Sequence, residues 1–181
     1  RLGALLEDVG VRAVLGQDPR MQTIVKLRVI GRSQQMLRVD FEREPDHEVL
    51  AQMLDDFERE IEQHDLVLFS DYGKGGLAHI PRMIEMARAA GKVVLIDPKG
   101  SDYDRYAGAT IITPNRAELQ QVVGSWQGEV DLQRKAEALR IRLGLKALLL
   151  TRSEEGMSLF EEGKVSHVQA QAREVADVTG A

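Results

Sequence analysis

The apolar run Leu66-Val67-Leu68-Phe69-Ser70 leads directly into the polar, glycine-rich residues Asp71-Tyr72-Gly73-Lys74-Gly75-Gly76. An apolar run without alternation is typical of a strand that is covered on both faces. The same succession of strand and polar loop recurs for strands expected at 93–97, 110–113 and 147–151. Helix-periodic segments separate the strands, around 80–90, after Asn115 and around 132–143. Repeated βα units predict an α/β fold with a mostly parallel central sheet and helices on both faces.

The first third of the chain alternates with a period of two. Val25, Leu27 and Val29 share one face of an expected strand, and Lys26 and Arg28 share the other. A second strand over 35–41 follows turn residues at 31–33 and carries Arg38 on its polar side. The pattern predicts a small β-hairpin with one basic face, which is either a solvated surface or a face for an anionic ligand. Its role as a lid, an edge or a dimer contact stays open.

Shorter signals surround these elements. A β-like run is expected at 11–15, an amphipathic helix from Asp46 onward, and a second hairpin over 157–160 and 165–168. Arg1 is not an initiator residue, and the last residues stop in a turn-like segment. We therefore expect the chain to be a fragment of a longer protein.

Composition limits the classes of function. The 181 residues carry a net charge of −5 and no cysteine. Such a chain offers no basic surface for nucleic acid and no thiolate metal site. No apolar run approaches the ~20 residues that cross a bilayer. We expect a protein of the cytoplasm with no nucleic-acid or membrane partner.

Polar side chains follow each expected strand, where ligands gather in a parallel sheet. Asn115 and Glu118 stand three residues apart at a strand-to-helix junction. This spacing suits an N-terminal capping pair, and it equally suits a pair that organises Mg²⁺ and its waters. The loop 71–76 lacks the Walker A spacing, but its glycines let backbone approach a ligand, and Lys74 is either a phosphate partner or a solvated lysine. A small-residue segment at 177–181 is suited to forming an anion-binding concavity.

Three motifs, in this order, resemble those of the ribokinase-like (PfkB) sugar kinases. Asn115-Arg116-Ala117-Glu118 matches the N-x-x-E motif of that family. Thr151-Arg152-Ser153-Glu154-Glu155-Gly156 resembles its T-x-G-x-x-G loop, with Ser153 in place of the first glycine. Asp177-Val178-Thr179-Gly180-Ala181 matches the first five positions of its D-x-T-G-A-G-D signature. Within the family, segments such as 34–42, 70–75 and 95–100 resemble the heptose-7-phosphate kinase/ADP-heptose synthase group.

The resemblance implies a ribokinase-like kinase domain over residues 1–181, as a fragment that lacks the N-terminal sugar-binding part and the C-terminal catalytic part. It implies ATP-dependent phosphorylation of D-glycero-D-manno-heptose 7-phosphate at the C1 hydroxyl, in ADP-heptose and lipopolysaccharide core synthesis. The catalytic aspartate of the signature would follow Ala181, so the fragment alone is expected to be inactive. A homodimer and an adenylyltransferase domain fused in the parent chain are also expected.

The resemblance also assigns roles to residues. Glu118 and Asn115 would organise Mg²⁺ through its waters, and Gly180 and Ala181 would begin the anion hole. Asp177 would fix that loop or hold a monovalent cation. The residues expected to bind the nucleotide are Asn115, Arg116, Glu118, Thr151, Ser153, Gly156 and Asp177. The residues expected to bind the sugar phosphate are Lys26, Arg28, Arg38, Asp71, Lys74 and Lys99.

Two alternatives remain. One is a ribokinase-like kinase for another sugar phosphate, such as a hexose phosphate. The other is a non-catalytic domain that binds a nucleotide or a sugar phosphate. A dinucleotide-dependent oxidoreductase is disfavoured, because no G-x-G-x-x-G motif follows a strand with an acidic residue ~20 positions later.

Overall fold

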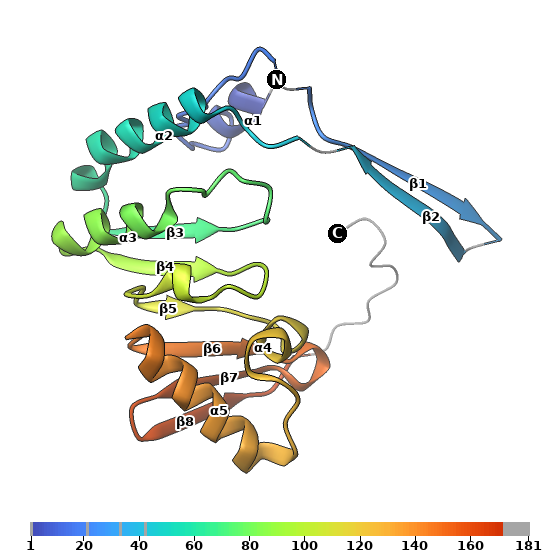
Figure 1. Cartoon of the computed structure of the whole chain (residues 1–181), viewed down its shortest axis with the longest axis vertical. Helices are drawn as coiled ribbons and strands as arrows, with labels where there is room; N and C mark the ends of the chain where they lie inside the picture. Colours follow the sequence, from blue (N-terminus) through green and yellow to red (C-terminus); the bar gives the residue numbers. More distant parts are fainter. Residues whose placement is uncertain (1, 21, 33, 42, 172–181) are drawn as a thin grey trace. The chain divides into compact units, whose positions relative to one another are not determined.

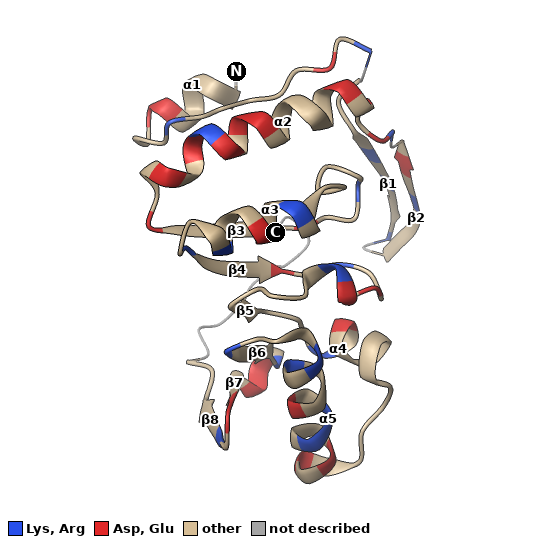
Figure 2. Cartoon of the chain, turned by 60° about the vertical axis from the view of Figure 1, so that its left-hand side comes forward, with Lys and Arg blue, Asp and Glu red and all other residues tan. Residues whose placement is uncertain are grey.

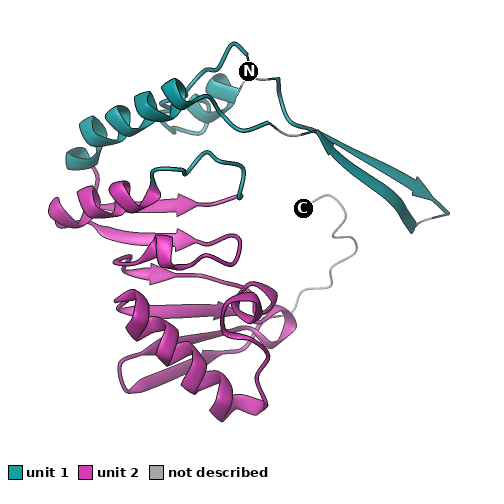
Figure 3. Ribbon diagram, in the orientation of Figure 1, with its two compact units in different colours: residues 1–63, 73–79 teal, residues 64–72, 80–181 magenta. Residues whose placement is uncertain are grey.

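The computed structural model describes residues 2–20, 22–32, 34–41 and 43–171. The chain divides into two compact units, which Figure 3 colours separately. Unit 1 comprises residues 1–63 and 73–79, and unit 2 comprises residues 64–72 and 80–181. None of the helices in the described ranges is long and apolar enough to span a membrane.

Unit 1 contains helices and a separate two-stranded sheet (Figure 1). Its elements are α1 (Leu2–Glu7), β1 (Val25–Gly31), β2 (Gln34–Phe41), α2 (His47–Glu60) and η1 (Ile61–Gln63). Asp46 caps α2, because its side chain accepts a hydrogen bond from the Glu48 backbone N–H. Strands β1 and β2 pair antiparallel, with Leu27 opposite Val39 and Arg28 opposite Arg38. The predicted hairpin and its basic face are therefore confirmed.

One expected element of unit 1 is wrong. Residues 11–15, expected as a β-like run, form no strand. Gly16, just after them, lies against the side chains of Val49 and Met53 on α2. Val11, Val14 and Leu15 stay 46%, 54% and 47% exposed. No described strand pairs with this segment, so its backbone joins no sheet.

Unit 2 is built on one six-stranded sheet with the order β3-β4-β5-β6-β7-β8. Strands β3 (Leu66–Ser70), β4 (Val93–Asp97), β5 (Ile111–Ile112) and β6 (Ala147–Thr151) are parallel. Strands β7 (Met157–Glu161) and β8 (Lys164–Val168) continue the sheet antiparallel. The helical segments are α3 (Ile80–Ala89), η2 (Asp104–Tyr106), α4 (Arg116–Val123), α5 (Gly128–Leu143) and η3 (Ser153–Glu155). The mostly parallel α/β sheet predicted from the sequence is confirmed.

The core of unit 2 lies between this sheet and its helices. Val94, Ile96, Ile112, Leu148 and Leu150 are fully buried along neighbouring strands. Helix α3 packs near β4, and α5 packs near β6 and β7 (Figure 1). Their buried residues, Ile80 and Ile84 on α3 and Leu132 and Leu139 on α5, complete the layer. Because the helices pack against the buried faces of the strands, the ends of β3 to β6 fix the starting points of the loops that follow.

Leu148→Ala should lower the free energy of unfolding by about 2–5 kcal/mol, because it leaves a cavity in a fully buried position. Val130→Ala is a matched control, since Val130 is 84% exposed on α5, and its effect should stay within about 0.5 kcal/mol. The two variants of the full-length gene product are compared by chemical denaturation. Equal losses in both would contradict the assignment of this core.

Candidate active site

The polar ends of the parallel strands of unit 2 meet at one edge of the sheet. Ser70 pairs with Asp97 at the ends of β3 and β4. The Thr113 backbone N–H donates to the carbonyl of Ile96 at 2.9 Å, and Asn115 forms a parallel bridge with Thr151. The sequence therefore correctly predicted that these four loops share an edge.

Asn115 and Glu118 form a complete capping box at the start of α4. The Asn115 side-chain oxygen accepts from the Glu118 backbone N–H at 2.9 Å, and Glu118 Oε2 accepts from the Asn115 backbone N–H at 3.0 Å. The capping interpretation of this spacing is thus confirmed. It fixes the Glu118 carboxylate at the strand-end edge, where the residue is only 8% exposed.

Lys99 neutralises the second oxygen of that carboxylate. Lys99 Nζ lies 2.9 Å from Glu118 Oε1. This bond and the charge of Glu118 raise the pKa of Lys99. Loss of surrounding water raises the pKa of Asp97, the Glu118 carboxylate adds to the rise, and a hydrogen bond from Ser70 opposes it. The Glu118 and Asp97 carboxylates therefore lie near a single ammonium group, that of Lys99, and this arrangement favours binding of a further cation.

The Tyr103 hydroxyl is a buried polar group that feels the charges of these carboxylates. Tyr103 is 1% exposed, and its hydroxyl has no hydrogen-bond partner within the described part of the chain. Burial raises its pKa, and the charges of Glu118 and Asp97 contribute to the rise. An unsatisfied buried hydroxyl costs about 1–3 kcal/mol, so a water or a hydrated ion at this position would be favourable.

These groups fit a hydrated Mg²⁺ better than a metal enclosed by protein. Within the described ranges, no cluster of three or more His, Asp or Glu residues could hold a metal ion by itself. Mg²⁺ commonly keeps several waters and takes one or two carboxylates together with substrate phosphates. Glu118 and the orphaned Tyr103 hydroxyl suit that mode of binding.

Asp71 anchors the loop that carries Lys99. The Tyr106 hydroxyl donates to Asp71 Oδ2 at 2.8 Å, and it accepts from the Lys99 backbone N–H at 3.1 Å. Asp71 is 6% exposed, and Arg105 Nη1 lies 3.8 Å from it. Burial raises the pKa of Tyr106 to about 12. Sequence reasoning missed Tyr106, because a tyrosine 35 residues after an aspartate gives no signal of contact.

The loop after β6 lies against the start of α4. The Thr151 backbone N–H donates to the carbonyl of Pro114 at 3.0 Å. Arg116, the first residue of α4, pairs through Nη1 with Glu155 Oε1 at 2.6 Å. Ser153 has a positive φ of 53°, and Gly156 has a φ of 92°. The structure thus brings together Asn115, Arg116, Glu118, Thr151, Ser153 and Gly156, all predicted for the nucleotide.

The predicted sugar-phosphate residues fall in two groups. Asp71 and Lys99 belong to unit 2. The other four belong to unit 1, where Figure 2 shows basic residues on β1 and β2. Arg38 binds Asp40 through two hydrogen bonds of 2.9 and 2.6 Å, and Lys26 and Lys74 help to lower the pKa of Asp40. Arg38, Lys26 and Lys74 therefore form one basic group around the Asp40 carboxylate, and Arg28 stands opposite Arg38 in the hairpin. Asp177, Gly180 and Ala181 lie outside the described residues.

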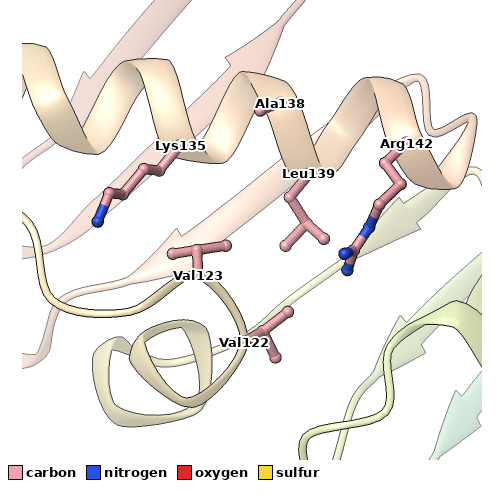
Figure 4. A pocket seen from close by; sticks show the side chains of 6 residues that line it. All are labelled: Val122, Val123, Lys135, Ala138, Leu139 and Arg142. Atoms are coloured by element: carbon pink, nitrogen blue, oxygen red, sulfur yellow. The ribbon is translucent and has the colours of Figure 1, made fainter.

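A groove of about 230 Å³ lies elsewhere in unit 2, between α4 and α5 (Figure 4). Its lining residues are Val122, Val123, Lys135, Ala138, Leu139 and Arg142. Lys135 donates to the carbonyl of Ser125, and Arg142 Nε lies 3.4 Å from Asp104. None of the predicted site residues lines this groove.

The chain belongs to the pfkB family of carbohydrate kinases, whose pattern it matches over residues 1–181. It is 46% identical over 181 residues to D-beta-D-heptose 7-phosphate kinase of Bordetella bronchiseptica, covering 100% of this chain and 58% of that protein. It is 52% identical over 161 residues to bifunctional protein HldE of Aeromonas salmonicida, covering 88% of this chain and 34% of that protein. The chain thus spans little more than half the length of the first relative and about a third of the second.

Solved structures agree with the fold. Ribokinase of Giardia lamblia superposes with a TM-score of 0.73 at 14% identity, over 96% of this chain and 57% of the other. Phosphofructokinase-2 of Escherichia coli, solved with fructose-6-phosphate, gives a TM-score of 0.71 at 16% identity, over 97% of this chain and 60% of the other. At this level of identity the likeness establishes the ribokinase-like fold.

Gly156→Ala should destabilise the loop after β6 strongly. A Cβ at Gly156 would overlap the carbonyl oxygen of Val168, in addition to the strain of its positive φ. Backbone strain of this kind alone costs about 1–3 kcal/mol. Gly163→Ala is the matched control, because Gly163 has a φ of 67° with open space around it. Thermal unfolding of the full-length gene product should show the larger loss for Gly156→Ala; a larger loss at Gly163 would refute the loop conformation.

Proposed function

We propose that the full-length protein transfers the γ-phosphoryl group of ATP to the C1 hydroxyl of D-glycero-D-manno-heptose 7-phosphate. The observation that carries the proposal is the oriented, nearly buried Glu118 carboxylate, held beside the Thr151 loop by the capping box and the Asn115–Thr151 bridge. The relative that is 46% identical along this whole chain bears the name of a heptose 7-phosphate kinase. The name of that relative favours this substrate over other sugar phosphates.

The nucleotide is proposed to lie along the edge formed by Thr151, Ser153 and Gly156. Phosphoryl transfer depends mostly on positioning and on stabilising the charge of the phosphate oxygens. Mg²⁺ would neutralise part of that charge, and Glu118 and Asn115 would orient its waters. Lys99, already paired with Glu118, adds a positive charge at the same edge.

The hairpin of unit 1 is proposed to bind the 7-phosphate. Arg28 and Arg38 stand directly opposite each other in β1 and β2. Like charges in this position destabilise a two-stranded sheet. A phosphate between them would convert the repulsion into two charge-assisted interactions, and arginine offers bidentate geometry for it. This supports the anionic-ligand interpretation of the basic face.

The chemical step is an in-line displacement. The C1 oxygen of the heptose forms a bond to the γ-phosphorus, the bond from that phosphorus to the β,γ-bridging oxygen breaks, and ADP leaves. The hydroxyl proton passes to the aspartate proposed to follow Ala181. Gly180 and Ala181 would begin the anion hole for the transferring group, and Asp177 would fix that loop or hold a monovalent cation.

We propose a cytoplasmic enzyme of ADP-heptose synthesis, with an adenylyltransferase domain in the parent chain. A homodimer is proposed through the apolar face of the hairpin, where Val25, Leu27 and Leu37 are each about half exposed, at 54%, 49% and 53%.

An assay of ADP release by the full-length gene product tests the activity. Turnover is expected with D-glycero-D-manno-heptose 7-phosphate and not with ribose, fructose 6-phosphate or tagatose 6-phosphate. Glu118→Gln should reduce activity about 10- to 100-fold, because it weakens the orientation of the cation. Glu137→Gln is the control, since Glu137 pairs with Arg140 on α5. Turnover of another sugar would overturn the substrate assignment, and no turnover of any sugar would favour a binding domain.

Arg28→Met should raise the KM for the heptose phosphate about 10- to 100-fold, because it removes one charge-assisted hydrogen bond to the phosphate. The KM for ATP should stay unchanged. Arg32→Met is the control on the same hairpin, because Arg32 lies in its exposed turn. Both constants are read from initial rates at fixed ionic strength. Equal effects of the two substitutions would remove Arg28 from the proposed phosphate site.

A further inference from the structure

Arg152 is a buried arginine at the centre of a chain of ion pairs, called the ladder below, that links Glu129, Arg152, Glu155 and Arg116. Its side chain is 7% exposed. Its Nη1 and Nη2 donate to the two oxygens of Glu129 at 2.9 and 2.6 Å, and Nη2 also donates to Glu155 Oε2 at 2.6 Å. A further bond of 3.1 Å joins Nη1 to the hydroxyl of Ser158 on β7. The guanidinium therefore connects the start of α5, the loop after β6 and strand β7.

The ladder continues to the start of α4. Glu155 accepts from Arg152 through Oε2 and from Arg116 through Oε1. Hydrogen bonds from Arg116 and from Arg152 lower the pKa of Glu155, and those from Arg152 lower the pKa of Glu129. Both carboxylates thus stay charged at neutral pH, and the order Glu129–Arg152–Glu155–Arg116 alternates in sign along its length.

The residues that the ladder holds are those expected to meet the nucleotide. Thr151 precedes Arg152 and bridges to Asn115, and Ser153 follows it with a left-handed φ of 53°. A non-glycine residue seldom adopts that conformation. The contacts of Arg152 and Glu155 fix the ends of the loop around Ser153.

Lysine could not replace this side chain. An ammonium group cannot make the planar, bidentate contact with Glu129 while it also reaches Glu155 and Ser158. The interactions depend on a rigid fork of donors, of which Arg152 uses three nitrogens: Nε, Nη1 and Nη2.

We propose that Arg152 is a positioning residue for the nucleotide: with Glu129 and Glu155 it sets the distance and orientation of the Thr151–Gly156 loop relative to Asn115 and Glu118. The inference rests on the proposed function, because it assumes that this loop binds ATP. Arg152 acts through the loop, since its own guanidinium is buried and engaged.

Arg152→Lys in the full-length gene product tests the inference, with Arg140→Lys as the matched control. Arg140 is also buried, forks onto both oxygens of Glu137 at 2.7 Å and donates to the carbonyl of Leu145. Arg152→Lys should raise the KM for ATP about 10-fold or more, the usual effect of losing a supporting contact. The KM for the heptose phosphate should change less than about twofold. Arg140→Lys should leave both constants unchanged, even where the two variants lose similar thermal stability.

Equal KM values for ATP in both variants, or parallel rises for ATP and sugar, would overturn the inference. Glu155→Gln gives a second measurement if Arg152→Lys does not fold, because Glu155 is 41% exposed and its loss separates Arg116 from Arg152. It too should raise the KM for ATP selectively, and an unchanged value would count against the ladder. If the unmodified protein shows no turnover, the proposed function fails; if it turns over and these variants match the control, the inference alone fails.

Discussion

The hydrogen bonds of the Glu118 carboxylate hold together the edge of the sheet where the parallel strands of unit 2 end. One oxygen closes the capping box of α4, and the other receives the ammonium of Lys99 from the loop after β4. A single side chain thereby ties two loops and a helix start to the same point. Because Glu118 is only 8% exposed, its charge requires these partners. The structural role of Glu118 and its proposed role toward Mg²⁺ depend on the same geometry.

Much of the fold could be predicted from the sequence, since hydrophobic periodicity reports directly on burial. The unbroken apolar runs at 66–70, 93–97 and 147–151 gave strands with those bounds. The run at 11–15 failed, because a few apolar residues do not reveal whether their partner is a strand or a helix. The strand expected at 110–113 comprises only Ile111–Ile112, because only these two residues pair with each neighbouring strand.

The candidate site was predictable where local spacing sets the chemistry. Asn115 and Glu118 are three residues apart, so one capping geometry explains both. Arg152 and Glu129 are 23 residues apart, and Asp71 and Tyr106 are 35 apart. Such pairs depend on the packing of different elements, which no local pattern encodes. Local spacing therefore predicts residues that are expected to face a ligand, but not the distant residues that hold them in place.

The hairpin of unit 1 has a consequence for the order in which parts of the protein unfold. Its two strands form a sheet by themselves, with apolar side chains on one face about half exposed and two arginines opposed on the other. An isolated pair of strands is marginally stable in water, whereas the strands of unit 2 share a buried core. Local opening of the hairpin should thus require far less free energy than opening of the central sheet, and its amide protons should exchange with solvent first. A ligand that bridges the two arginines binds only the closed hairpin and therefore stabilises it against local opening. The affinity for such an anion and the protection of the hairpin amides from exchange are thus thermodynamically linked.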